Sequence, residues 1–333
     1  MPKIVIKDIT PKLGLPGGSV TITGKRFQPW ELDSTSLHFT SSTAWIDGVS
    51  ETTLLTSIPP NSSTGDVYID GGGYKSNKFR FVIPDAIVGG LHLVDNPVVD
   101  NNGNIFATYS GNRGESTPVS VYRITKTGEK EVYLTGITNA TSLAVGPDNA
   151  LYIASRYDGK IYRSVKKNHF EIFSQGLGIA FGLAFNKKGD LYVGDRTGSI
   201  FSIDSQGQAS FYASIPQSYI AFHMNFDNED NLYVSNPVHM GENIIFRVDK
   251  NNGKFKVFYS GLSLFHGFIF DSKNTLYLAE TKRNESRIIK IVSGKYVSTI
   301  LTGTNFLGLT FDKNLNLVVA TSNSLYLIEK GSY

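Results

Sequence analysis

Short runs in which apolar residues recur at about every second position are spread along most of the chain. Examples are residues 198–204, 243–249 and 255–259. A period of two is typical of β-strands that bury one face. The segments between the runs, such as 101–103 and 187–189, are rich in Gly, Asp, Asn and Lys, which suit the tight turns of hairpins. Because no helical period accompanies these runs, the pattern predicts an all-β protein.

From about Asn96 onward the pattern repeats itself. Each repeat is anchored, after a polar turn, by an apolar residue that is followed in most units by an aromatic one. The anchors are Ile105-Phe106, Leu151-Tyr152, Leu191-Tyr192, Leu232-Tyr233, Leu276-Tyr277 and, in a weaker form, Leu317-Val318, at spacings of 46, 40, 41, 44 and 41 residues. Each unit divides into four short strands, and such a period is typical of propeller blades. The repeats therefore predict a six-bladed β-propeller.

The sixth unit ends after the strand at 325–329 and lacks a fourth strand. A closed ring leaves no free sheet edge, so we expect residues around Ala86 to Leu93, upstream of the first unit, to supply the missing strand. This closure is also expected to hold the N-terminal region beside the first and sixth blades. The aromatic anchors, and most of the 17 Tyr and 21 Phe, are expected to fill the space between blades.

The first 83 residues do not fit the repeat. They contain a Pro-Gly-Gly turn at 16–18, an alternating strand at 20–23 and a Gly-x-x-Phe pattern that begins at Gly24. The later strand at 66–70 fits the second half of the same arrangement. These motifs resemble the TIG domain, also called IPT, which is a small immunoglobulin-like sandwich. The resemblance implies an all-β spacer or adhesion module without catalytic residues of its own.

Length and composition agree with two globular domains, which we place at residues 1–83 and 84–333. The 333 residues include 40% hydrophobic residues, enough to build packed cores and to exclude a disordered chain. The formal net charge is only +3 and no run of Lys or Arg exceeds two residues, which argues against a nucleic acid partner. The absence of cysteine excludes disulfides, thiolate zinc sites, iron–sulfur clusters and a cysteine nucleophile.

The sequence shows neither a secretory signal nor a membrane-spanning segment. Residues 1–8 lack the apolar stretch of a signal peptide, and no run of 18 apolar residues occurs. We therefore expect a cytoplasmic protein, or a secreted one if a leader has been removed, with no membrane partner. Because a closed propeller needs no second copy to cover its edges, we expect a monomer.

Two segments of the third unit, 180–186 and 189–195, resemble the gluconolactonase/regucalcin family and the neighbouring NHL propellers. The resemblance covers about residues 88–333. It implies a divalent cation (Ca²⁺, Mn²⁺ or Zn²⁺) at one end of the central channel, where oxygen ligands hold it and it polarises a lactone carbonyl. The positions that correspond to the family's ligands are Asn96, Thr141, Phe181, Phe222, His266 and Leu307. Of these, Asn96 and His266 carry ligand-type side chains and are the metal candidates, whereas the other four depart from the family's pattern.

Other polar residues lie near the same end of the channel. His223, His266, Asp195 and Glu280 would provide two bases and two carboxylates for acid–base chemistry or metal binding, and they are the catalytic candidates. The candidates for binding a ligand are Asn96, Tyr109, Arg113, Arg156, Arg196, Asn236 and His239. The competing interpretation is structural, since adjacent Asp and Arg residues, such as Asp195 and Arg196, commonly hold loops through hydrogen bonds.

The propeller itself indicates a fold and not an activity. We favour a protein that binds a small molecule or a peptide at the end of the channel, because four of the six channel positions lack a metal-ligand side chain. The alternatives are a divalent-metal-dependent lactone or ester hydrolase, as the resemblance implies, and a propeller-type lyase that uses His223 and His266. Convergence of the four catalytic candidates on one pocket would favour an enzyme.

Overall fold

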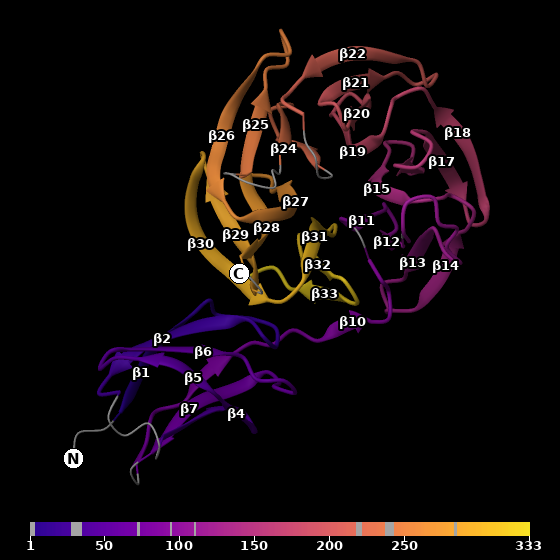
Figure 1. Ribbon diagram of the computed structural model, residues 1–333. Coiled ribbons are helices and arrows are strands. Elements are labelled where there is room, and N and C mark those ends of the chain that lie inside the picture. The colour runs from indigo at the N-terminus through magenta and orange to yellow at the C-terminus, as the bar shows by residue number, and fades with distance from the viewer. Residues whose placement is uncertain are drawn as a thin grey trace.

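The computed structural model consists of two β-domains that lie side by side (Figure 1). It describes residues 4–27, 35–71, 74–93, 95–109, 111–217, 222–236, 243–282 and 285–333. These residues form strands and no α-helix, so none of them forms a helix that could span a membrane. The prediction of an all-β protein is confirmed.

The N-terminal domain is a sandwich of two sheets whose strands bury alternate side chains. In the second strand, for example, Val20 and Ile22 are buried while their neighbours are more exposed. Together with Leu37 and Phe39 they contribute to the core between the sheets. One sheet has the strand order β1-β2-β6-β5, and the other has the order β4-β3-β7-β8 with β9 beside β7. The strands are β1 (Val5–Thr10), β2 (Ser19–Lys25), β3 (Thr35–Phe39), β4 (Ser42–Ala44), β5 (Ile46–Val49), β6 (Thr53–Ser57), β7 (Gly65–Gly71), β8 (Tyr74–Lys75) and β9 (Phe79–Phe81).

The second domain is a ring of blades around a central channel (Figure 1), and its described residues form six four-stranded sheets. The first strand of each blade is innermost and contacts the first strands of both neighbouring blades. Blade one comprises β11 (Val98–Val99), β12 (Ile105–Thr108), β13 (Val121–Ile124) and β14 (Lys130–Leu134). Blade two comprises β15 (Ala140–Val145), β16 (Leu151–Ser155), β17 (Ile161–Lys166) and β18 (His169–Ser174). Blade three comprises β19 (Ala180–Phe185), β20 (Leu191–Asp195), β21 (Ser199–Ile203) and β22 (Ala209–Ser214). Blades four and five comprise β23 (Met224–Phe226), β24 (Leu232–Asn236), β25 (Asn243–Val248) and β26 (Phe255–Leu262); and β27 (Leu264–Phe270), β28 (Thr275–Lys282), β29 (Glu285–Val292) and β30 (Lys295–Gly303). Blade six comprises β31 (Phe306–Phe311), β32 (Leu317–Thr321), β33 (Leu325–Ile328) and β10 (Ala86–Val88). The six-bladed prediction is confirmed.

The ring closes with a strand that precedes the first blade. β10 pairs antiparallel with β33, with Ala86 opposite Tyr326 and Val88 opposite Leu325. It therefore supplies the outer strand of the sixth blade, and the buried residue Leu91 that follows it packs in the core between blades six and one. The prediction that residues around Ala86 to Leu93 complete the sixth blade is confirmed.

Aromatic anchors on the second strands pack against the next blade along the ring. The ring centroids of each contact lie between 4.5 and 5.4 Å apart, mostly in edge-to-face arrangements. Such contacts add to the burial of apolar area and hold neighbouring blades together. The pairs are Tyr152–Phe185, Tyr192–Phe226, Tyr233–Phe270 and Tyr277–Phe311.

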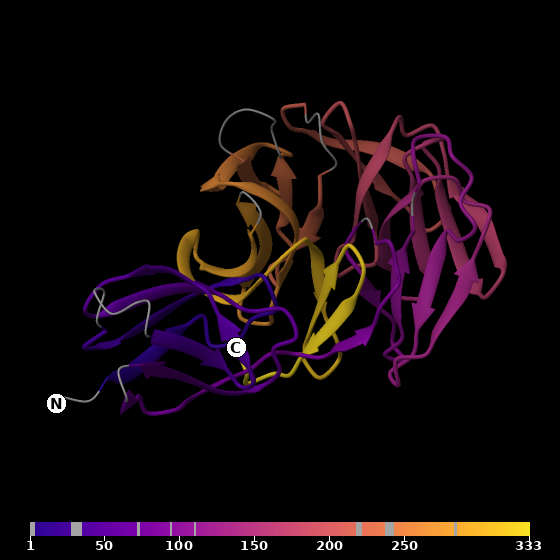
Figure 2. The ribbon, with the colours of Figure 1, turned by 60° about the horizontal axis from the view of Figure 1, so that its bottom comes forward.

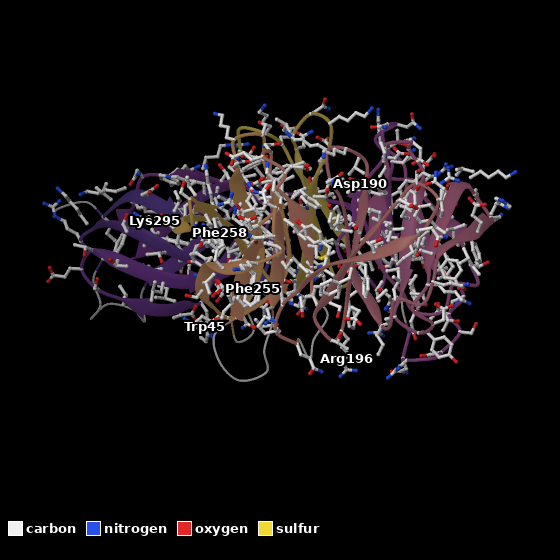
Figure 3. The ribbon with its side chains drawn as sticks, turned by 90° about the horizontal axis from the view of Figure 1, so that it is seen from above. Trp45, Asp190, Arg196, Phe255, Phe258 and Lys295 are labelled. Atoms are coloured by element: carbon white, nitrogen blue, oxygen red, sulfur yellow. The ribbon has the colours of Figure 1, made fainter. Side chains whose placement is uncertain are left out.

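Because the strands of a blade alternate in direction, the ring has two distinct faces. We call the face with the starts of the first strands and the turns from second to third strands face A, and the opposite face with the other turns face B. Figure 3 views the ring from its side, with Arg196 on face A and Asp190 on face B. On face B, an Asp or Asn after the first strand caps the following turn: Asp227 Oδ1 accepts hydrogen bonds from the N–H groups of Glu229 and Asn231, both at 2.9 Å.

The sandwich docks against blades five and six. The N–H of Leu15 donates to the carbonyl of Thr302 at the end of β30 (2.8 Å). Leu13 and Leu15 are buried in one cluster with Leu301 and Phe306 of the propeller. Figures 1 and 2 both show the indigo domain against the yellow strands. The expected place beside blades one and six is thus corrected, because the loop before β2 pairs with a strand of blade five.

Candidate functional site

Residues at equivalent positions of the first strand of each blade line the channel. The equivalence follows from how each first strand pairs with the second strand of its blade. The innermost position is held by Asn96, Ser142, Gly182, His223, Gly267 and Gly308. The position before it, nearer face A, is held by Asp95, Thr141, Phe181, Phe222, His266 and Leu307. The alignment made from sequence is therefore wrong by one residue in the first blade, where Asp95, and not Asn96, corresponds to His266.

Asn96 reaches across the channel from blade one to blade four. Its Nδ2 lies 2.8 Å from Nδ1 of His223, and its Oδ1 accepts a hydrogen bond from the N–H of Leu309 at 3.0 Å. The inner glycines of blades five and six leave room for this side chain. A Cβ on Gly267 would lie 1.5 Å from Asn96 Oδ1, and a Cβ on Gly308 would lie 2.2 Å from it. The channel is thus asymmetric: glycines on one side admit a polar side chain from the other.

Asp95 is buried beside the same histidine. Its Oδ1 lies 3.1 Å from Nδ1 of His223, and its Oδ2 accepts a hydrogen bond from Oγ of Ser142 at 2.9 Å. The N–H of Asn96 also donates to Oδ1 (2.6 Å). Burial by itself raises the pKa of Asp95, but the charge of His223 and the hydrogen bonds outweigh burial, and the pKa lies below its usual value. The carboxylate is therefore ionised at neutral pH.

His223 Nδ1 lies within hydrogen-bonding distance of one donor and one acceptor. The side-chain amide of Asn96 presents an N–H donor to it, because Asn96 Oδ1 is occupied by a backbone N–H. The carboxylate of Asp95 is an acceptor. When Nδ1 carries a proton it donates to Asp95, and when it does not it accepts from Asn96. The His223 backbone N–H is held by Oγ of Ser235 at 2.7 Å, which fixes the start of the strand.

His266 lies close to this group but carries no charge at neutral pH. Burial lowers its pKa to about 4, and the neighbouring His223 lowers it as well, against the opposing effect of Asp95. No hydrogen bond joins its imidazole to another residue that the structure describes. Among the described residues neither ring nitrogen of His266 has a partner, and an uncharged imidazole carries one donor and one acceptor nitrogen.

The channel beside these side chains is narrow. It forms a cavity of about 70 Å³ that extends along the first strands from Asp95 to Thr310. A cavity of this size holds a few water molecules. The cavity therefore has no room for a larger ligand, and Asp95 and His266 lie toward its face A end.

Asp195 and Glu280 occupy equivalent positions in the second strands of their blades, three residues after the aromatic anchors Tyr192 and Tyr277, and both contact residues of their own blades. Asp195 Oδ1 accepts a hydrogen bond from the N–H of Thr197 at 2.8 Å and so caps the turn to the third strand. Glu280 pairs with Arg287 on the neighbouring strand, with 2.6 Å between Oε2 and Nη2. These two carboxylates are thus engaged in holding a turn and a strand pair, and no contact among the described residues joins them to His223 or His266.

The residues at the channel do not suit a hard divalent cation. Within the described ranges, no group of three or more His, Asp or Glu side chains lies in a position to hold a metal ion. Asn96 Oδ1 already accepts a backbone hydrogen bond, and His266 adds only a nitrogen. A hard cation requires several oxygen ligands. Asn96 and His266 therefore do not form the metal site that the family resemblance implies.

Three further candidates lie on the face A side of blades one and two. Tyr109 follows β12 and packs edge-on against His92, with ring centroids 5.6 Å apart. Arg156 donates through Nη2 to the carbonyl of Gly111 at 3.1 Å, while its buried Nε has no partner among the described residues. Arg113 is exposed. Arg156 is thus used at least in part to connect the turns of two adjacent blades.

The remaining candidates belong to blades three and four. The backbone N–H of Arg196 donates to the carbonyl of Ile179 at 3.1 Å, and its side chain is half-buried. Asn236 is 5% exposed, and its Oδ1 has no hydrogen-bond partner in the part of the chain that the structure describes. His239 lies outside the described residues.

Comparison with known proteins identifies the first domain. The family model "IPT/TIG domain" matches residues 5–83. Residues 5–83 are an IPT/TIG domain. The resemblance inferred from the Pro-Gly-Gly turn and the strand after it is confirmed, and a search of curated protein sequences found no match to the chain.

Solved structures support the fold of the IPT/TIG domain followed by a propeller. An auxiliary nutrient binding protein from Bacteroides thetaiotaomicron has a TM-score of 0.57 and 12% identity, and the match covers 98% of this chain and 97% of that one. A gluconolactonase from Xanthomonas campestris has a TM-score of 0.61 and 16% identity over 73% of this chain and 88% of its own. Virginiamycin B lyase from Staphylococcus aureus has a TM-score of 0.53 and 14% identity over 93% and 99%. At these identities the matches show the fold and leave the activity open.

Sequence reasoning did not find Asp95 and Ser142 in the propeller that follows the IPT/TIG domain. A usable signal was present, because Asp95 lies eleven residues before the second anchor residue Phe106, and His266 lies eleven before Tyr277. Counting back from the anchors would have aligned the two. Ser142 has the size of the small residues at the inner position, and nothing in the sequence distinguishes it as a partner of Asp95.

Proposed function

We propose that this protein binds a small polar molecule at the face A end of the propeller channel. The observation that carries the proposal is the meeting of Asp95 and His223 from opposite blades, with the uncharged His266 beside them. Buried charge is costly unless it is paired, so a buried carboxylate that holds an imidazole creates an oriented polar anchor.

The geometry favours a ligand with hydroxyl or carbonyl groups. His266 offers a donor and an acceptor, and the side chain of His223 retains 12% exposure through which a ligand can reach it. The narrow cavity beneath excludes anything larger than water, so the ligand rests on the channel end. The binding role agrees with the name of the auxiliary nutrient binding protein whose fold covers nearly the whole chain.

Titration calorimetry with neutral monosaccharides, disaccharides, sugar lactones and short peptides tests this proposal. His223→Gln and His266→Gln should each weaken the best ligand at least tenfold, because they remove an imidazole from the anchor. His169→Gln is the matched control, since His169 is exposed on β18. Absence of binding across the panel, or an equal loss in the His169 variant, would refute the proposal.

A second candidate is acid–base catalysis on a lactone or ester, or an elimination of the kind a lyase performs. The observation that favours it is that His266 remains an uncharged base beside the Asp95–His223 pair. Mass spectrometry of incubated ligands would reveal turnover. His266→Gln should then abolish product formation while changing ligand affinity less than the rate. Turnover that persists in this variant would exclude His266 as the base.

A further inference from the structure

The third and fourth strands of blades one and two carry the same cross-strand charge pair. In blade one Arg123 lies opposite Glu131, and in blade two Arg163 lies opposite Glu171. These positions are equivalent, because each arginine also lies opposite the aromatic anchor of its blade, as Arg163 lies opposite Tyr152. Opposite charges in direct register stabilise a sheet.

Both arginines are neutralised in the structure. Arg123 forms an ion pair and a hydrogen bond with Glu131. Arg163 pairs with Glu171 at 2.9 Å and with Asp148 at 2.8 Å. The arginine head groups of blades one and two therefore have no unbalanced charge to offer to a ligand.

Blade four has the arginine of blades one and two without the glutamate. Arg247 holds the equivalent position opposite its anchor Tyr233, but the residue facing it on β26 is Lys256. Like charges in direct register are unfavourable. The guanidinium of Arg247 makes neither a hydrogen bond nor an ion pair with any other described residue. Asp227, which corresponds to Asp148 of blade two, does not form an ion pair with Arg247 either.

The carboxylate of Asp227 is occupied inside its own blade. It accepts hydrogen bonds from the side-chain amide of Asn231 at 2.9 Å and from the hydroxyl of Tyr233 at 3.1 Å. It is only 6% exposed. The guanidinium of Arg247 thus stays uncompensated at the surface of the blade.

Arg247 and Lys256 line a groove of about 470 Å³ at the face B end of blade four. Lys250 and Lys254 join them, against two acidic residues, Glu229 and Asp249. Asn251, Asn252 and Phe255 also line the groove, and Figure 3 marks this blade with Phe255 and Phe258 of β26.

Shape alone does not distinguish this groove. A groove of about 480 Å³ lies at the junction of blades two and three, but there Arg163 is matched by Asp148 and Glu171 in the lining. The propeller architecture therefore provides the hollow, and the replacement of the acidic partner by Lys256 provides its positive charge.

We infer that the blade four groove binds a small polyanion, a molecule with two or more phosphate, sulfate or carboxylate groups. One anionic group bridges Arg247 and Lys256 and takes the place of the glutamate found in blades one and two. A second group is met by the lysines of the turn between β25 and β26. Charge-assisted hydrogen bonds from Arg and Lys to oxyanions are stronger than neutral ones, and the side chains of Asn251 and Asn252 add donors.

Titration of the full chain with pyrophosphate, citrate and a sulfated disaccharide, at low ionic strength, tests the inference. It also shows whether the groove prefers phosphate, carboxylate or sulfate groups. Lys256→Glu should weaken the tightest of the three at least tenfold, because it restores the Arg–Glu pair of blades one and two. The same variant should unfold at an equal or higher temperature, so lost binding would not reflect lost folding. Lys295→Glu is the matched control, because it makes the same change of charge at an exposed start of a strand in blade five.

Binding that falls in Lys256→Glu and is retained in Lys295→Glu supports the site. Binding of none of the three anions, or an equal loss in both variants, overturns it, the latter because net charge alone would then account for the affinity. His223→Gln should leave anion binding unchanged. An effect of this variant would place the anion at the channel and also refute a separate site.

Discussion

At the scale of single residues, the most direct consequence of the channel geometry concerns His266. Its pKa is lowered to about 4 in the folded protein and is about 6.5 in the unfolded chain. Between these values the unfolded chain binds a proton that the folded protein does not, so stability falls as pH falls from 6.5 to 4. We expect this residue to account for a loss of about 3 kcal/mol at most over that range.

Urea denaturation of the protein and of His266→Gln at several pH values measures this contribution. The variant should lose less stability than the parent between pH 6.5 and 4, because it has no imidazole to protonate when unfolded. His169→Gln should follow the parent. Parallel pH profiles for parent and His266→Gln would show that His266 is not held uncharged by the fold.

The second residue-scale prediction concerns the close approach of Asn96 to Gly267. An added Cβ would lie 1.5 Å from Asn96 Oδ1, so Gly267→Ala must displace the amide from His223. We expect Gly267→Ala to lower the free energy of unfolding by about 1–3 kcal/mol, as for other overpacked sites. Denaturation of Gly48→Ala provides the control, because its Cβ would have no neighbour nearer than 3.7 Å.

The same contact can be isolated with a double-mutant cycle. In an Asn96→Ala background the amide is gone, so Gly267→Ala should cost less than it does in the parent. Equal costs in both backgrounds would mean that the clash involves some other group.

The channel also shows which residues sequence alone could identify. His223 and His266 were predictable, because imidazoles at a position where other units have Gly, Phe or Thr are conspicuous. The turn-capping role of Asp195 was not predictable, because a carboxylate that caps a turn and one that faces a channel have the same sequence signal. Asp95 was missed for lack of an exact alignment in blade one.

At the scale of elements, the strands were predictable because each has its own local signal. The anchors, the alternating runs and the polar turns recur in every blade, and the observed strands β12, β16, β20, β24 and β28 begin at or one residue before the predicted anchors. The closing strand had no such signal. Its place followed from the need of β33 for a partner, which is a property of the whole sheet.

The closing strand gives a prediction about truncated chains. A chain of residues 84–333 retains β10 and the buried side chains Leu91 and Leu93, and we expect it to unfold cooperatively. A chain of residues 95–333 loses all three, and the edge of β33 is left open. Calorimetry should show no cooperative transition for the shorter chain, or a much lower transition temperature. Similar transitions in the two chains would mean that β10 is dispensable for closing the ring.

At the scale of the whole molecule, the position of the IPT/TIG domain was not predictable from local patterns. Leu13 and Leu15 belong to a loop, yet they are buried against Leu301 and Phe306, about 290 residues away in sequence. An apolar residue in a loop has the same sequence signal whether it serves the core of its own domain or a neighbouring domain. The expected placement beside blades one and six therefore failed where strand prediction succeeded.

Gly18 lies at the tightest point of this domain contact and provides the test of it. A Cβ there would lie 2.5 Å from the backbone nitrogen of Gly303 and 2.6 Å from the carbonyl carbon of Thr302. Backbone atoms of a paired strand cannot yield easily, so Gly18→Ala should force the two domains apart and not merely shift a side chain. We expect a broader and longer distance distribution between spin labels on the two domains.

The chain suits this experiment because it contains no cysteine, so Thr43→Cys and Ser210→Cys give single labels on the sandwich and on blade three. Gly89→Ala is the control, since its Cβ would meet nothing nearer than 3.5 Å. If Gly18→Ala leaves the distances unchanged, the contact at Thr302 does not hold the domains in place. The buried leucines of the loop would then be sufficient by themselves to hold the two domains together, and Leu15→Ala would have to lengthen the distances between the labels.

If Gly18→Ala separates the domains while the anion and channel titrations stay unchanged, the two binding sites belong to the propeller alone. The IPT/TIG domain then acts as a docked spacer.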